Sequence, residues 1–233
     1  MPFRAEMVQE LQNRDKSVRT DVLQQLDRVN VKKEEAERIL PILTEMFVQE
    51  PTKKWKKLLA SLVVKCTPLA HDIPELDVPE LVEWLTLALK EAKSRNDTFC
   101  AFGRLRSAAS QGWDITPAIP LLLEKVSTQW VCYALETLAD AARNGIDVLE
   151  FDTLKGLQAW ELFRLTLKLT PSGSIRHDIL NVLTELARHR ASHLEMFLSL
   201  VEEAVADTRM SKDFLRDAAA CLAAFQAAGV EPD

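Results

Sequence analysis

The chain has 233 residues, 47% of them hydrophobic, with 29 Lys/Arg against 35 Asp/Glu and a net charge of −6. This apolar content is enough for a core without metals or disulfides, and the negative charge argues against a polyanion-binding protein, which normally has a basic excess. The sequence has no run of about 18 apolar residues and no apolar signal-peptide core, so we expect a cytoplasmic protein without a membrane span.

Amphipathic periodicity and helix caps divide the chain into six helical pairs, taken here in chain order. Three segments place a capping residue three positions before a Glu: Asp77–Glu80, Asp147–Glu150 and Ser192–Glu195. The predicted pairs are 3–29, 31–68, 77–110, 115–143, 147–189 and 192–228. No linker rich in Gly, Ser or Pro separates them, so we expect a single domain over residues 1–233.

One block of the sequence occurs twice, 33 residues apart. Residues 101–115 (AFGRLRSAASQGWDI) align with residues 134–148 (ALETLADAARNGIDV), and the match includes Gly112 with Gly145 and Asp114 with Asp147. Each copy is an amphipathic helix, a Gly stop and an Asp that starts the next helix. Self-similarity at this period is typical of an α-solenoid, in which helical pairs bury their apolar faces by stacking.

An apolar–Arg step also recurs, as Val18-Arg19, Ile175-Arg176 and Leu215-Arg216, each opening an Ala/Leu-rich helix. This apolar–Arg step at the start of a helix resembles the second helix of HEAT repeats. The resemblance implies an all-α fold, a right-handed α-α superhelix (α-solenoid) of about six HEAT-like pairs. It also implies that the Arg and a turn Asp tie neighbouring repeats together, and that the second helix of each pair lines a concave binding face.

Helical phase on the second helices separates core-facing from outward positions. The outward residues proposed to contact a partner are Lys53, Lys57, Tyr133, Glu136, Asp140, His177, Asn181 and Arg188. Tyr133 and Arg188 lead this set because Tyr and Arg are enriched at binding hot spots.

The helix over 96–110 instead turns small residues outward, namely Asn96, Cys100, Gly103 and Ser107. Two interpretations remain open for this face. Either another helix approaches it closely, or it forms a shallow groove that receives a side chain of a partner.

Candidate chemistry is sparse. The KKWKK segment at 53–57 fits a solvated helix start, a contact with an anionic partner or a nucleic-acid patch. Trp55 falls on the core side, which weakens the last interpretation. His189 and His193 straddle a predicted helix boundary, and the four cysteines are single, so we predict no metal and no cofactor.

These features predict a non-enzymatic scaffold or adaptor that binds a protein or peptide partner on the concave face. One alternative is an immunity or inhibitor protein that neutralises a basic toxin or enzyme. The one enzyme class considered is a HEAT-like alkylpurine DNA glycosylase, for which the chain offers Trp84, Trp113, Trp130 and Trp160 near Asp114 and Asp140. A second copy of the chain docking on the Ala-rich C-terminal helix is a further hypothesis.

Overall fold

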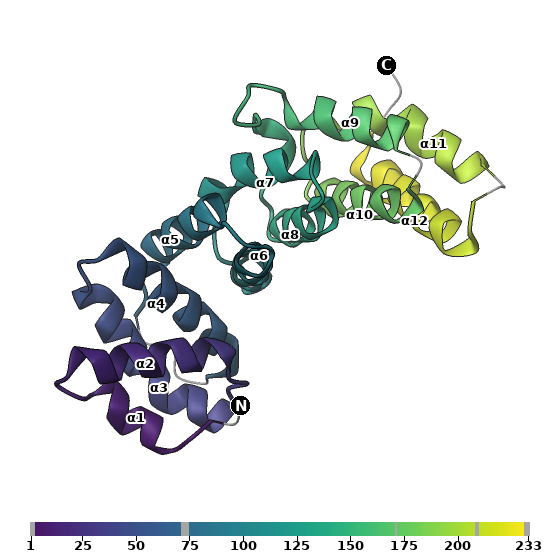
Figure 1. Ribbon diagram of the computed structural model, residues 1–233. Helices are drawn as coiled ribbons and strands as arrows, with labels where there is room; N and C mark the ends of the chain where they lie inside the picture. Colours follow the sequence, from purple (N-terminus) through teal and green to yellow (C-terminus); the bar gives the residue numbers. More distant parts are fainter. Residues whose placement is uncertain (1–2, 71–74, 171, 208–209, 231–233) are drawn as a thin grey trace. The chain divides into compact units, whose positions relative to one another are not determined.

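A computed structural model describes residues 3–70, 75–170, 172–207 and 210–230. The described chain is built from helices, drawn in Figure 1. The α-helices are α1 (Glu6–Leu11), α2 (Lys16–Arg28), α3 (Lys33–Gln49), α4 (Lys53–Cys66), α5 (Val78–Glu91), α6 (Arg95–Ser110), α7 (Ile119–Val126), α8 (Val131–Arg143), α9 (Ala159–Leu169), α10 (Gly173–Arg188), α11 (Leu198–Ala206) and α12 (Lys212–Ala228). Taken two at a time, they give six pairs and an all-α fold.

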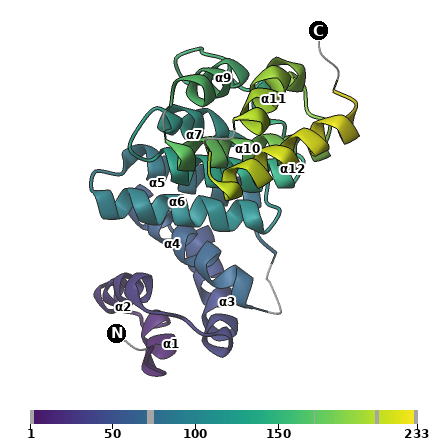
Figure 2. The same ribbon diagram turned by 90° about the vertical axis from the view of Figure 1, so that its right-hand side faces the viewer.

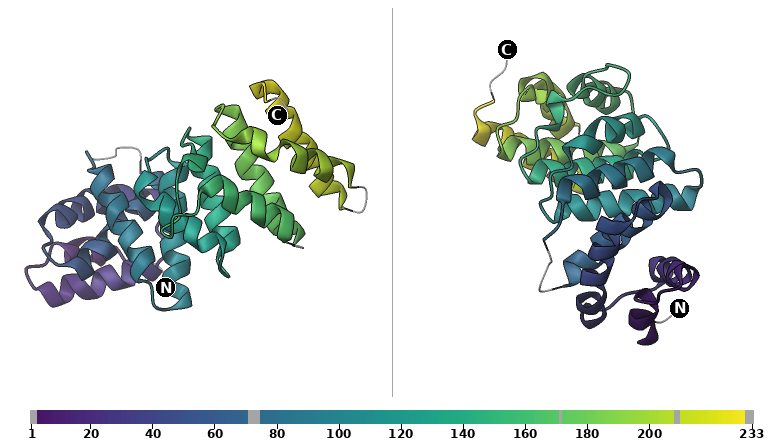
Figure 3. Two further views of the ribbon diagram at one scale, coloured as in Figure 1. Left: turned by 90° about the horizontal axis from the view of Figure 1, so that it is seen from above. Right: turned by 90° about the vertical axis from the view of Figure 1, so that its left-hand side faces the viewer.

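The chain forms two compact units, residues 1–113 and residues 114–233. In the first unit α4 contacts α2, α3, α5 and α6, and Figure 3 shows α1 and α2, in purple, lying against each other. In the second unit α10 packs between α8 and α12, while α9 and α11 lie on one side of this layer (Figures 1 and 2). The even-numbered helices are the second members of the pairs, so in each unit they form the layer that the repeat resemblance implies.

The core follows the predicted apolar stripes. Side chains that are at most 1% exposed include Leu59 and Leu62 in α4, Leu138 in α8, and Ile179 and Leu183 in α10. Burying a Leu or Ile side chain stabilises the fold by roughly 1.5–3 kcal/mol. The apolar periodicity therefore fixes which side of each helix faces its neighbours.

Side chains cap several of the helix starts. Asp15 accepts the Ser17 amide at the start of α2, and Asp77 accepts the Glu80 amide at the start of α5. Two predicted caps are wrong. Asp147 caps only a 3-10 turn (Val148–Glu150), and α9 begins later, at Ala159. The Ser192 amide and hydroxyl instead donate to Asp147, at 2.7 and 2.6 Å, so this Ser joins two repeats.

The block that occurs twice has the same backbone geometry in both copies. Gly112 and Gly145 have φ of 80° and 85°, in the left-handed region that glycine adopts most readily. The Trp113 amide donates to the Ala108 carbonyl and the Ile146 amide to the Ala141 carbonyl, each at 3.2 Å. These are the closing bonds of a Schellman motif, which satisfies carbonyls left over at a helix C-terminus. The sequence repeat is therefore a structural repeat of a helix stop.

The recurring Arg step has a different role from the one that the resemblance implies. Arg19 donates to the carbonyls of Asn13 and Arg14, and Arg176 donates to the Leu167 carbonyl at 3.1 Å. Arg19 and Arg176 therefore bind backbone within their own helical pairs, whereas Arg216 pairs with the Asp213 and Asp217 carboxylates of its own helix. None of these contacts links two pairs. The reason is that an Arg in the first turn of the second helix lies beside the turn that precedes it.

A lysine from one helix closes the end of another in the first unit. The Lys65 ammonium of α4 donates to the carbonyls of Leu26, Asp27 and Val29, at 2.8, 3.0 and 2.7 Å. The last carbonyls of a helix have no partners within it and carry partial negative charge. Lys65 therefore ties the C-terminus of α2 to α4.

Candidate functional site

The predicted binding surface of the second unit lies on α8, α10 and α12, the packed layer of second helices. Tyr133 is 39% exposed on α8, and Asn181 and Arg188 are exposed on α10, as predicted. Glu136 and His177 are partly buried. Five of the eight predicted contact residues therefore retain solvent access on one layer.

Asp140 was predicted to face outward, and this is wrong, since the residue is only 6% exposed. Helix α8 buries Ala139 and Ala141 as well as its predicted core stripe, so its outward arc is narrower than periodicity indicates. Arg143, one turn later, forms an ion pair with the Asp140 carboxylate. A buried carboxylate is tolerated only when a cation or hydrogen bonds compensate the lost hydration.

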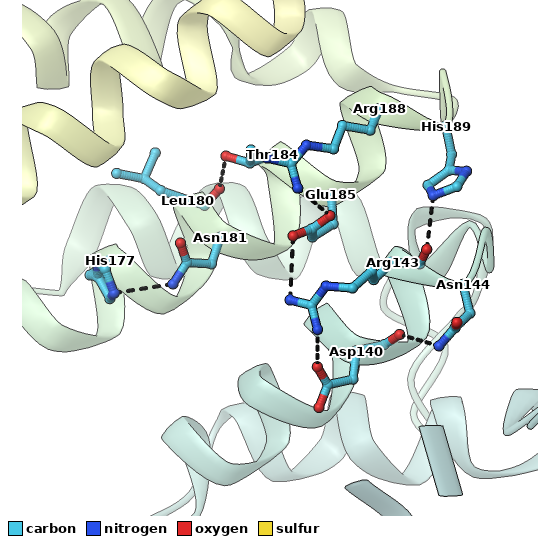
Figure 4. A network of polar contacts seen from close by, with 10 residues as sticks. All are labelled: Asp140, Arg143, Asn144, His177, Leu180, Asn181, Thr184, Glu185, Arg188 and His189. Carbon is cyan, nitrogen blue, oxygen red and sulfur yellow. Dashed lines mark hydrogen bonds and ion pairs between the residues drawn. The ribbon is translucent and has the colours of Figure 1, made fainter. Parts of the chain in front are cut away.

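Arg143 is also the centre of a row of alternating charges that crosses from α8 to α10 (Figure 4). Its second guanidinium nitrogen lies 3.3 Å from the Glu185 carboxylate on α10. The other oxygen of Glu185 accepts from Arg188 at 2.7 Å. Glu185 is only 8% exposed, whereas the side chains of Arg143 and Arg188 are 56% and 59% exposed. Two buried carboxylates therefore hold two exposed guanidinium groups in fixed positions.

Desolvation lowers the pKa of Arg143, but the hydrogen bond to Asp140 and the charge of Glu185 outweigh it and raise this pKa above its ordinary value. The guanidinium is charged at every pH at which the protein folds. We name Asp140, Arg143, Glu185 and Arg188 the charged row.

A second polar chain links α10 to α12. Asn181 Nδ2 lies 3.1 Å from His177 Nε2, and His177 Nδ1 lies 2.8 Å from Asp217 Oδ2 (Figure 4 shows the first contact). With the amide nitrogen donating to Nε2, the ring proton of a neutral His177 sits on Nδ1 and faces the carboxylate. Two of the predicted contact residues are thus oriented by each other and by α12.

Aromatic side chains lie at the start of α8. Trp130 and Tyr133 have ring centroids 5.8 Å apart, with planes inclined by 53°. Such tilted pairs are favourable and restrict both rings. The layer therefore offers an aromatic pair at the N-terminal end of α8 and the charged row toward its C-terminal end.

In the first unit, the predicted contact residues Lys53 and Lys57 converge on one carboxylate. Both ammonium groups lie 2.6 Å from Glu91, at the end of α5. Hydrogen bonds from Lys53 and Lys57 lower the pKa of the exposed Glu91 carboxyl to about 2. The two lysines and Glu91 therefore form a charged cluster of their own in the first unit.

The face of small residues on α6 borders a hollow of about 240 Å³ between α4, α5 and α6. A Cβ added at Gly103 would meet no atom of the described residues within 4 Å. Of the four small residues on the predicted face, Cys100 is the one that lines this hollow, so a groove borders part of the face and its use by a partner stays a prediction. Gly103 lies beside the hollow on the exposed side of the helix.

The histidines that are four residues apart have separate roles. His189 Nε2 lies 2.9 Å from the Arg143 carbonyl at the end of α8, and the His193 ring stacks on Trp160 at 6.0 Å. Among the described residues, no three His, Cys, Asp or Glu side chains are grouped as a metal site would require.

The carboxylates proposed for a glycosylase are engaged in structural roles. Asp114 accepts the Thr116 amide at 2.9 Å in a turn, and Asp140 belongs to the charged row. Trp84 donates to Glu80, and Trp160 to Gln158. This arrangement gives no support to a shared Trp/Asp centre.

Sequence analysis missed Arg143 and Glu185. Both lie outside the outward stripe, but a signal was present. Asp140/Arg143 and Glu185/Arg188 are acid–Arg pairs with the same spacing of three, and the pairs are 45 residues apart. A repeated pair on consecutive second helices predicts stacked rows in a solenoid, where equivalent positions lie side by side.

Comparison with solved structures places the chain among helical-repeat proteins. It resembles an engineered protein, with a TM-score of 0.61 and 13% identity over 96% of both chains. It also resembles a computationally designed armadillo repeat protein for modular peptide recognition, with a TM-score of 0.60 and 14% identity over 94% of this chain and 98% of that one. A designed armadillo repeat protein in complex with the peptide (KR)4 matches with a TM-score of 0.61 and 16% identity over the same shares.

The fold is therefore an all-α helical-repeat solenoid, and two of these neighbours are armadillo repeat proteins, so HEAT specifically is not confirmed. No protein-family profile matches the sequence. No curated protein matches it either. Within the described residues, the helices are too short or too polar to cross a bilayer.

Proposed function

We propose that this protein is a non-enzymatic binding scaffold whose α8–α10 face holds a protein or peptide partner. The observation that carries the proposal is the charged row, in which buried carboxylates hold exposed arginines in place before any partner arrives. Preorganised side chains lose less conformational entropy on binding, so more of the contact energy is available as affinity.

The aromatic pair at Trp130 and Tyr133 complements this row. Tyr and Arg are the side chains that most often dominate interface energetics, because they bury large areas and make directional contacts. An extended or helical segment lying along α8 and α10 would meet Tyr133 first and then the arginines. Recognition of peptides by designed armadillo repeat proteins of the same fold is consistent with this use of the surface.

The first test is a pull-down from lysate of the native host with wild type, a Tyr133→Ala/Arg188→Ala variant and a matched control. Arg164→Ala/Leu165→Ala is the control, since it removes an exposed aromatic-contacting Arg and an exposed apolar residue from α9 instead. We expect a stoichiometric protein that is retained by wild type and control and lost by the variant. Loss of two hot-spot side chains typically costs on the order of 100-fold or more in affinity. Recovery of nucleic acid released by modest salt would contradict the proposal and favour the glycosylase alternative.

A second candidate is the capture of a basic partner, as an inhibitor or immunity protein would do. Residues 114–233 carry 18 Asp/Glu and 11 Lys/Arg, a net charge of −7. A field of this sign attracts cationic partners and speeds their association. One solenoid of this fold was solved with the basic peptide (KR)4. The affinity of the protein for (KR)4 and for an (EK)4 control peptide, measured by fluorescence anisotropy, tests this second candidate. Equal affinity for both peptides would contradict the capture of a basic partner.

Self-association through α12 is a separate proposal. This helix leaves Ala220, Ala223 and Ala227 exposed, a small apolar surface on which a second copy of the helix could pack. Sedimentation over a wide concentration range tests it, and a monomer at every concentration would remove it.

A further inference from the structure

The hollow between α4, α5 and α6 has an apolar floor. Leu85 is fully buried, Ala101 is 6% exposed, and Leu58 and Ala88 are partly buried at its wall. Its volume of about 240 Å³ exceeds that of the ~150 Å³ engineered cavity known to hold one benzene molecule. The space therefore fits a single aliphatic side chain with its backbone at the mouth.

The mouth stays open because α6 presents little bulk there. Cys100 lines the hollow, and a Cβ added at the neighbouring Gly103 would meet no atom within 4 Å. Gly in a helix interior lowers helix stability by about 1 kcal/mol relative to Ala. No close packing at Gly103 compensates for this loss of stability. The space around position 103 is therefore free at the size of a Cβ.

Charges around the mouth are unevenly distributed. Lys53 and Lys57 share the Glu91 carboxylate, and the ammonium of Lys54 lies 5.0 Å from the centre of the Trp55 ring. Two lysines therefore share one carboxylate at this edge, which leaves one positive charge without a counter-charge there. The low pKa of Glu91, about 2, accords with this local excess of positive charge.

The opposite edge is balanced. Arg104 donates to the Ser61 hydroxyl at 3.1 Å and lies 3.8 Å from the Asp27 carboxylate. Asp97 also borders the hollow, but it is held in the capping box at the start of α6, where it accepts the Ser94 amide at 3.3 Å. The surplus of positive charge is thus confined to the lysine edge at the start of α4.

We propose that this hollow anchors a partner peptide through one Leu, Ile or Val side chain, with an adjacent Asp or Glu on the lysine edge. The apolar floor takes the aliphatic group, and the polar rim excludes water around it, as is typical of an interface anchor. The acidic neighbour selects among partners and sets the register of the peptide. This site belongs to the first unit. A negative result here would not contradict the proposal for the α8–α10 face, and the reverse also holds.

The test uses a random 12-residue peptide library displayed on phage, selected on the full chain. We expect an enriched consensus in which an aliphatic residue adjoins Asp or Glu. The affinity of a synthetic consensus peptide for wild type and for four variants is then measured by fluorescence anisotropy. Cys100→Phe fills the hollow and should weaken binding by about 10-fold or more, as expected when an anchor is displaced, while Cys100→Ser should leave it unchanged.

Two further variants keep the outcome interpretable. Lys53→Gln/Lys57→Gln should weaken binding by about 5-fold and flatten its salt dependence, because two exposed ion pairs are lost. Tyr133→Ala/Arg188→Ala should bind as wild type does, which separates this site from the α8–α10 face. Thermal melting confirms that each variant folds. A basic consensus, no enrichment, or affinity that survives Cys100→Phe in a folded protein would overturn the proposal.

Discussion

Two glycines in the chain have opposite local environments, and we expect opposite effects of alanine at each. Gly145 ends α8 with φ of 85°, so Gly145→Ala forces a left-handed conformation and should destabilise the protein by about 1–2 kcal/mol. Gly103 lies inside α6 with open space around it, so Gly103→Ala should stabilise by about 0.5–1 kcal/mol. Urea unfolding followed by circular dichroism gives both values. Two shifts of the same sign would contradict the assigned backbone roles.

The Glu91 carboxyl gives a prediction about pH. Its folded pKa is about 2, below its ordinary value of 4.5, because Lys53 and Lys57 bind the ionised form. The stabilisation from this contact is therefore complete above about pH 4.5 and is lost as the pH falls through about 2. NMR titration of the Glu91 side chain should show this midpoint in wild type. It should move toward 4.5 in Lys53→Gln/Lys57→Gln and at high salt, because the carboxylate is exposed to solvent.

At the scale of helices, Lys65 is the clearest tie between two elements. Lys65→Met removes three hydrogen bonds from the α2 carbonyls while keeping most of the side chain's bulk. We expect a loss of about 2 kcal/mol, the size typical of hydrogen bonds to a charged group. Lys90→Met, an exposed substitution in the last turn of α5, is the control and should change stability by less than about 0.5 kcal/mol. An equal loss of stability in the two variants would mean that the bonds from Lys65 to the α2 carbonyls do not stabilise the fold.

The charged row gives a second prediction at this scale. Arg143→Met takes the shared guanidinium away from two buried carboxylates, one on α8 and one on α10. Because the Arg side chain is itself 56% exposed, we expect a cost of about 1–2 kcal/mol, below that of a fully buried pair. Adding Asp140→Asn should recover part of the loss, since a neutral amide needs no counter-charge. Unfolding of the single and double variants measures this coupling.

At the scale of the whole molecule, one buried thiol lies in each compact unit. Burial raises the pKa of Cys66 to about 11 and that of Cys221 to about 12. Partial burial also raises the pKa of Cys100 and Cys132, but these two thiols are partly exposed to solvent. Thiol reagents react with the thiolate, so at pH 8 we expect Cys100 and Cys132 to be modified in the native protein. Cys66 and Cys221 should react only through unfolding.

The labelling rates of the two buried thiols show how far the effect of a destabilising substitution extends along the chain. In repeat proteins each repeat contacts only its neighbours, so coupling falls with distance along the chain. Lys65→Met should therefore raise the labelling rate of Cys66 far more than that of Cys221, and Arg143→Met should do the reverse. Mass spectrometry of quenched samples measures both rates. Equal acceleration of both thiols by either variant would show that the chain unfolds as one cooperative unit.

The sequence alone determined the class of fold, the pairing of the helices and the repeated helix stop at Gly112 and Gly145. These depend on local periodicity, on capping chemistry and on the left-handed conformation that glycine accepts. It also placed Tyr133, Asn181 and Arg188 on the exposed side of their helices, because a stripe of core residues defines its opposite face.

The tertiary structure decided which outward positions remain outward. Asp140 is buried because α8 has neighbours on several sides and because Arg143 reaches from the same helix to Glu185 on α10. Ser192 caps no helix, because Asp147 of the preceding pair binds it. The contacts from Arg143 to Glu185 and from Ser192 to Asp147 join residues more than 40 positions apart, and the periodicity of a single helix does not encode them.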